Sequence, residues 1–255
     1  MEWRQVIENH ISASQLSKDR ISGNYHQKSG FGQYLELQLI SSNIMDDWKR
    51  GGPRLSDYIE PLCRFSNQCL ENNHTAEKFS LPVLWHSVCI SLFVDINRLE
   101  LAVGKSGYEQ AQAHRSYAHD WACSMAGHRC ALHGALILRH LESTALATEP
   151  AIHVPRVAFH AALVWFSYCE FGRGSSGVLP ATAYFPELSE LKLNCQRLLF
   201  EANSFKSVRP NVEECRTFYA LIDMLERIGH WGISHKFAAI LRVMVSETAE
   251  PKLSS

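Results

Sequence analysis

The sequence predicts an all-α protein, a multi-helix domain whose helices pack in an orthogonal or bundle-like arrangement. Apolar residues recur three or four positions apart through most of the chain, which is the spacing of one face of an α-helix. Helix boundary signals accompany these segments, such as Pro155 in a first turn and Gly172 after a last turn. We therefore expect helices to dominate throughout the 255-residue chain.

The most apolar stretch, Ala118 to Gly172, predicts two helices joined by a short link that contains a proline. The apolar stripes consist of Trp121, Met125, Leu132, Leu136 and Leu141 on the first helix, and of Val157, Ala161, Val164, Trp165 and Tyr168 on the second. Helices that are apolar on most sides are usually buried. This pair of helices therefore predicts the core of the domain.

Four further helices are expected before this pair. They are centred on Trp3–Ile11, Tyr34–Trp48, Leu55–Asn72 and Leu81–Gly104. The second could be a strand or a helix, and it is assigned as a helix because its neighbours are helical. The segment Ser22–Gly32 has loop composition and lacks the residue order of a phosphate-binding loop. The polar residues 105–116 favour the start of the first core helix.

The chain changes character after Gly172. Residues 172–190 are rich in glycine, serine and proline and predict a surface loop. Helices follow at 187–203 and at 212–228, the second with Asn211 as a potential N-cap in a capping box. Ser234 is expected to cap a last helix. This pattern divides the chain into an N-terminal segment of helices and loop (1–80), a helical domain (81–245) and a disordered tail (246–255).

Composition excludes several classes of function. Lys and Arg number 25 against 26 acidic residues, whereas a module that binds nucleic acid is usually basic. The N-terminus lacks the pattern of a signal peptide, and no apolar run reaches the roughly 18 residues that suggest a membrane span. Without an export signal, the eight cysteines are expected to be reduced thiols inside the cell.

A metal site is the first chemistry to test, because the chain has 13 histidines and 8 cysteines. The densest group is His119, Cys123, His128, Cys130 and His133. These residues cannot share one helix face, and the chain contains neither Cys-x-x-Cys nor His-Glu-x-x-His. Motifs for nucleophilic catalysis and dinucleotide binding are missing as well. We therefore predict no catalytic residue, no cofactor and no metal, and that the protein is not an enzyme.

Three ordered motifs resemble the fungal-specific transcription factor domain, the middle homology region of fungal zinc-finger and zinc-cluster regulators. They are Ala131–Glu142, Pro155–Gly172 and Leu225–Met244, and a similar segment precedes them near residues 81–100. The matching residues are His133, Ile137, Leu138 and Arg139 in the first motif and Ala161, Ala162, Leu163 and Trp165 in the second. The resemblance covers roughly residues 80–245 and implies a helical regulatory domain.

The resemblance also implies a nuclear protein that regulates transcription of a fungal gene set, such as a secondary-metabolite biosynthetic cluster. It would act through co-regulator proteins, the transcription machinery or an effector, and it could form a homodimer. The zinc modules with which this family binds DNA are not found in this chain, so DNA binding would need a zinc module outside it. We expect the C-terminal part of a regulator, a truncated gene product or a paralogue without fingers.

Two other functions remain open. The protein could be a helical enzyme or a small-ligand-binding protein of a biosynthetic cluster, with a cavity lined by Trp85, Trp121, Phe159 and Trp165. It could also be a helical adaptor or a dimerisation scaffold. In the regulator, the ends of His133, Arg139 and Trp165 could contact a partner, although a buried Trp165 and a snorkelling Arg139 are the simpler expectations.

Overall fold

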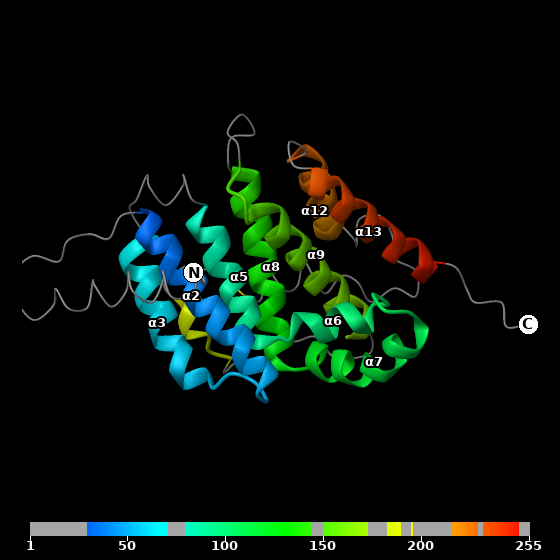
Figure 1. The fold of residues 1–255 in the computed structure, drawn as a ribbon, viewed down its shortest axis with the longest axis horizontal. Coiled ribbons are helices and arrows are strands. Elements are labelled where there is room, and N and C mark those ends of the chain that lie inside the picture. Colours follow the sequence, from blue (N-terminus) through cyan, green and yellow to red (C-terminus); the bar gives the residue numbers. More distant parts are fainter. Residues whose placement is uncertain are drawn as a thin grey trace, which may run out of the picture.

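The structure is a computed structural model that describes residues 30–70, 80–143, 150–172, 183–189, 195, 216–228 and 232–249. Within these residues it contains ten helices and no strand, so the predicted all-α class is confirmed. The helices form an elongated body in which α8 (Met125–Ser143) and α9 (Val154–Phe171) cross the middle (Figure 1). The predicted division at residue 80 stays a prediction, and the predicted first helix (Trp3–Ile11) lies outside the described residues.

Helices α2 (Gly30–Lys49), α3 (Leu55–Cys69) and α5 (Leu81–Phe93) lie together at one end of the body (Figure 1). The helix predicted from Tyr34 is therefore confirmed. Two tryptophans connect the three helices: Trp48 Nε1 donates to the carbonyl of Ser91 at 2.7 Å, and Trp85 Nε1 donates to that of Leu62 at 2.9 Å. Both bonds satisfy an indole N–H that packing removes from water.

The single helix predicted over Leu81–Gly104 is wrong, because the chain forms two helices there. α5 ends at Phe93, Val94 is extended, and α6 spans Ile96–Ala102. Asp95 is the N-cap of α6, and its carboxylate accepts from the N–H groups of Asn97 and Arg98 at 3.0 and 3.4 Å. A cap of this type contributes about 1 kcal/mol. It makes a new helix start favourable within an otherwise apolar run.

The first core helix is also divided. α7 spans Tyr108–Ala122, so residues 108–116 start a helix as predicted, but this helix ends before α8 (Met125–Ser143) instead of continuing into it. Ser124 lies at the break, where its hydroxyl donates to the carbonyl of Trp121 and accepts from the N–H of Gly127. The serine side chain thus satisfies backbone groups of both helix ends.

Helix α9 (Val154–Phe171) is the centre of the packing. It contacts α5, α6, α7, α8, α12 (Arg216–Arg227) and α13 (Gly232–Ala249). Most of its side chains are buried, including Leu163 and Val164 at 0% exposure. Pro155 lies in its first turn and Gly172 follows its last residue, as the sequence predicts. The expectation that the stretch Ala118–Gly172 forms the core is therefore confirmed.

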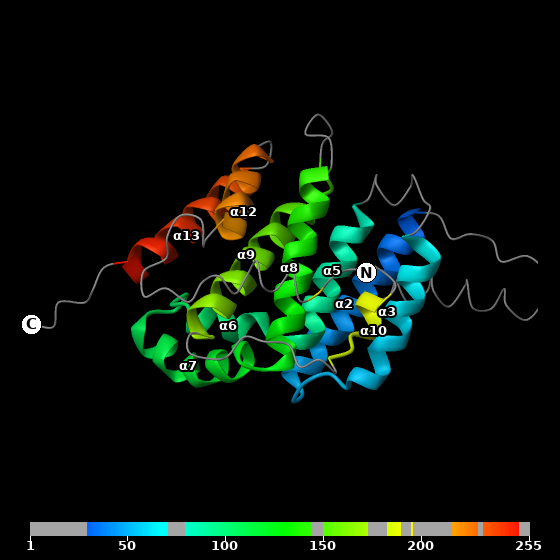
Figure 2. The ribbon, with the colours of Figure 1, turned by 180° about the vertical axis from the view of Figure 1, so that it is seen from behind.

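The remaining described helices are α10 (Pro186–Ser189), α12 (Arg216–Arg227) and α13 (Gly232–Ala249). α12 and α13 pack against each other and against α9, while α10 lies against α3, as Figure 2 shows from behind. Ser234 is not an N-cap, because it is the third residue of α13. That helix also continues to Ala249, beyond the predicted start of the tail at residue 246. Asn211 and most of 187–203 lie outside the described residues.

Two glycines of α8 give a prediction about the break between α7 and α8. A Cβ at Gly127 would lie 2.5 Å from the carbonyl oxygen of Trp121, whereas a Cβ at Gly134 would lie no closer than 3.5 Å to any neighbour. We expect Gly127→Ala to lower the free energy of unfolding by about 1–3 kcal/mol, because the backbone must move. Gly134→Ala should be neutral or stabilising by up to about 1 kcal/mol, because alanine favours helix. Urea unfolding of both variants tests this, and equal effects would contradict it.

Candidate functional site

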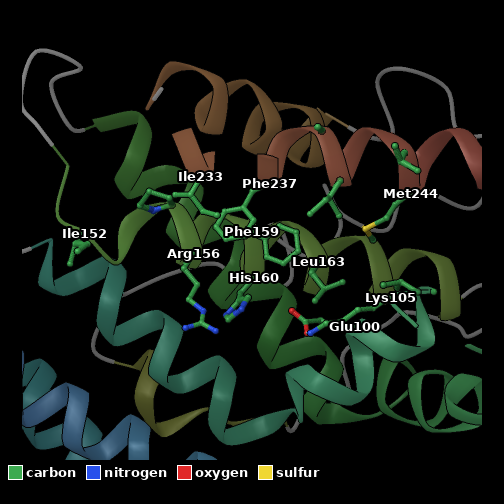
Figure 3. Close-up of a pocket in the computed structure, with 16 residues that line it drawn as sticks. Glu100, Lys105, Ile152, Arg156, Phe159, His160, Leu163, Ile233, Phe237 and Met244 are labelled. Carbon is green, nitrogen blue, oxygen red and sulfur yellow. The ribbon is translucent and has the colours of Figure 1, made fainter. Parts of the chain in front are cut away.

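The candidate site is a groove of about 880 Å³ between the end of α6, the first half of α9 and α13 (Figure 3). Its volume lies in the upper part of the range of small-molecule sites. Most of the residues that line it are apolar, and a few are charged or polar. We refer to it as the α9–α13 groove.

One wall of the groove is a single face of α9. Arg156, Phe159, His160 and Leu163 follow the helical spacing of three and four residues, so their side chains project from the same side of the helix (Figure 3). Leu163 is completely buried, whereas Arg156 is exposed. The wall therefore carries an exposed charged group near the start of α9 and a buried apolar side chain further along the helix.

The opposite wall is the face of α13 that carries Ile233, Phe237, Ile240 and Met244, again at helical spacing. The rings of Phe159 and Phe237 stack across the groove, with centroids 4.6 Å apart and an angle of 21° between their planes. Ile240 is 48% exposed, so this wall presents apolar surface to water. Exposed apolar surface next to a concave site indicates a binding surface.

Three charged side chains line the groove: Glu100, Lys105 and Arg156. Glu100 and Lys105 form an ion pair with each other. No ion pair of Arg156 is found among the described residues. Burial, with smaller contributions from Arg156 and Lys105, lowers the pKa of His160 to about 4. The imidazole is therefore neutral at pH 7, and the groove carries two positive charges against one negative charge.

A second polar group lies in the interior, between α8 and α10. The guanidinium of Arg129 donates to both oxygens of the Glu187 carboxylate, from Nε at 2.8 Å and from Nη2 at 2.6 Å. Arg129 also lies over the ring of Phe93, 4.2 Å from its centroid. Burial alone would raise the pKa of Glu187, but His133 and Arg129 lower it, to about 2 overall. The pair fastens α10 to α8, and neither residue lines the groove.

Two buried histidines lie beside this ion pair. His86 Nδ1 and His133 Nδ1 are 2.8 Å apart, so one ring donates its hydrogen to the other. His133 Nε2 lies 3.7 Å from Glu187 Oε1, which is too long for a hydrogen bond. Burial lowers the pKa of both histidines, which keeps them neutral at pH 7. This arrangement brings polar side chains of α5, α8 and α10 together in the interior, and no hydrogen bond of His133 Nε2 is found among the described residues.

The predicted aromatic cavity is wrong in its position. Trp85, Trp121 and Trp165 are buried side chains of the core, and Phe159 is the one member of the predicted set that lines the groove. His133 and Trp165 are at 0% and 2% exposure, so they cannot contact a partner as expected. Arg139 is exposed on α8. Trp165 therefore has the simpler predicted role, that of a core residue.

The predicted histidine and cysteine cluster is dispersed. His119 and Cys123 are neighbours, with 3.9 Å between Nε2 and Sγ, but Cys130 is buried against the carbonyl of Ile90 and His133 faces His86. In the described part of the chain, no three His, Cys, Asp or Glu side chains are placed to hold a metal ion. The cluster therefore offers no metal centre among those residues.

Comparison with known proteins identifies no relative: no family model, no curated protein and no solved structure matches the chain. The resemblance to the fungal transcription factor domain therefore stays a prediction. None of the described helices combines the length and apolar character needed to cross a membrane.

Proposed function

We propose that this chain is an effector-binding regulatory domain of a fungal transcription regulator, and that the effector binds in the α9–α13 groove. The observation that carries the proposal is the groove itself, with its apolar walls and a small number of charged groups. Sites of this size and composition are typical of small-molecule binding.

The position of the groove supports its link to the predicted family. Two of the three motifs that resemble the fungal domain, Pro155–Gly172 and Leu225–Met244, contain the α9 and α13 walls. The motifs therefore contribute residues to the core and to the groove. In such a regulator, effector binding would be passed on to co-regulator proteins in the nucleus, by a single copy or by a homodimer.

A regulatory effect needs a ligand that favours one arrangement of the protein over another. A ligand in the groove would contact α6, α9 and α13 at the same time. α13 packs against α9 and α12, whereas α6 packs against α7 and α9. Binding would therefore connect the α12–α13 pair to the α6–α7 pair, and a partner that contacts either pair could sense it.

The second candidate is a small-ligand-binding protein or enzyme of a biosynthetic cluster. The same groove favours it, because His160, Glu100 and Arg156 place ionisable groups beside an apolar surface. In this case the amount of a metabolite would depend directly on the protein, whereas the amounts of transcripts would not. The two functions therefore differ in what changes first when the groove is blocked.

The test is a strain that carries Ala239→Trp, because Ala239 is exposed on α13 and lines the groove. An indole at this position fills the groove without altering the core. The matched control is Lys236→Trp, at an exposed position of α13 that does not line it. We expect deletion and Ala239→Trp to change the same set of transcripts, while Lys236→Trp resembles the wild type.

If deletion of the gene changes the level of no transcript, the proposal that the protein regulates transcription is rejected. Loss of one metabolite with unchanged transcripts would favour the second candidate. If deletion changes a gene set that Ala239→Trp leaves intact, the protein regulates transcription without using the groove. Circular dichroism of the purified variants shows whether each remains folded.

A further inference from the structure

The charge of the groove indicates the kind of ligand that it takes. The Lys105 ammonium is paired with Glu100, so those two charges largely cancel. The guanidinium of Arg156 has no carboxylate partner among the described residues, although it lies beside a mostly apolar surface. A planar guanidinium presents several N–H donors in a geometry that matches a carboxylate. The groove therefore has one positive group available for an anion.

His160 lies one helical turn after Arg156, on the same side of α9 (Figure 3). Because its imidazole is neutral at pH 7, it adds no charge and can donate one N–H. It can therefore share an oxygen atom of an anion that binds Arg156. If His160 were protonated as well, the two positive charges would instead favour a doubly charged group such as a phosphate.

The rest of the groove requires an apolar ligand body. From Arg156 the surface continues over the stacked rings of Phe159 and Phe237 toward Met244 (Figure 3). Ile240 and Val243 on the α13 side are 48% and 53% exposed. Covering this surface removes apolar area from water, which favours binding. A fully polar anion would leave that surface exposed.

We propose that the α9–α13 groove binds an amphipathic organic acid with a single negative charge. Its carboxylate pairs with Arg156 and accepts a hydrogen bond from His160. Its aliphatic or aromatic body lies along Phe159, Phe237 and Ile240. This inference rests on the proposed function, because it names the chemical class of the effector.

Isothermal titration of the purified full chain with decanoate, decanamide and decylamine tests the inference. The three probes share a chain length and differ in the charge of the head group. Charge-assisted hydrogen bonds to arginine are among the stronger ones in proteins, so we expect decanoate to bind at least about tenfold more tightly than decanamide. Decylamine should bind most weakly, because its ammonium group is positively charged and is repelled by Arg156.

Variants locate the interaction. Arg156→Gln should remove the preference for decanoate over decanamide while leaving the binding of decanamide unchanged. Arg139→Gln, at an exposed arginine of α8 that does not line the groove, should keep the preference. Ala239→Trp should weaken the binding of all three probes, because the indole occupies the space of the ligand body.

Three outcomes would overturn the inference: equal affinities for decanoate and decanamide, a preference that survives Arg156→Gln, or no binding of decanoate. None of these outcomes would by itself reject the proposal that the protein is a transcription regulator. That proposal is tested by the transcript levels of the deletion and Ala239→Trp strains. Conversely, selective binding of decanoate together with unchanged transcripts would support this ligand class and reject the regulator.

Discussion

Replacing Glu187 with glutamine is expected to lower the free energy of unfolding by about 3–5 kcal/mol, the usual loss when one partner of a buried ion pair is removed. The Glu187 side chain is fully buried and that of Arg129 is 14% exposed, so water cannot replace the lost partner. The guanidinium would keep its positive charge between two aromatic rings, those of Phe93 and Phe185. Urea unfolding followed by circular dichroism measures the loss.

The matched control is Glu226→Gln, which breaks the exposed ion pair between Arg242 and Glu226. Exposed pairs contribute about 0–1 kcal/mol, so this variant should unfold almost like the wild type. Replacing both buried partners, as in Arg129→Met with Glu187→Leu, should recover part of the stability because no charge is left unpaired. Similar losses for Glu187→Gln and Glu226→Gln would show that the buried pair does not fasten α10 as described.

Acid is expected to destabilise the protein well above the pH at which most carboxylates titrate. Burial lowers the pKa of His153 and of His160 from the ordinary 6.5 to about 4. Between these values the unfolded chain binds more protons than the folded one, so stability falls as the pH decreases from about 6.5 to about 4. We expect each histidine to contribute on the order of 2–3 kcal/mol to this loss, because each pKa unit corresponds to about 1.4 kcal/mol and both rings keep some contact with solvent.

Glu187 extends the effect to lower pH. Its pKa is lowered from 4.5 to about 2, so its contribution to stability is complete above about 4.5 and is lost as the pH falls toward 2. Urea unfolding at a series of pH values between 7 and 3 measures the combined slope. His160→Gln should reduce the slope of the free energy of unfolding against pH between pH 6.5 and 4. His235→Gln, at an exposed position of α13, should leave this slope unchanged. An unchanged slope in His160→Gln would contradict the prediction.

The all-α class and the core could be predicted because they depend on repeated local patterns. The apolar residues of α9 recur at helical spacing, and Pro155 and Gly172 mark its ends. The helix breaks could not be located in this way, since each depends on one or two residues within an apolar run. Val94 adopts an extended conformation and Ser124 accepts one backbone N–H, and neither interrupts the hydrophobic pattern.

The groove could not be predicted, because its walls come from three helices that are far apart in the sequence. The predicted cavity combined the largest aromatic residues, but large aromatic side chains such as Trp85 fill the core. A signal was present in α9, where Arg156 and His160 lie four residues apart in an otherwise apolar run, residues 154–166. The ion pair between Arg129 and Glu187 left no comparable signal, because 58 positions separate the two residues.

The two long walls of the groove differ in how firmly the rest of the protein supports them. Among the described residues, α9 packs against six other helices, whereas α13 packs mainly against α9 and α12. Amide hydrogens of α9 should therefore exchange with solvent only when the whole protein unfolds, and those of α13 should exchange through smaller openings. The width of the groove then varies mainly with the position of α13, because α6 and α9 pack against each other. Such a site selects strictly for the acid group held at α9 and tolerates apolar bodies of different thickness.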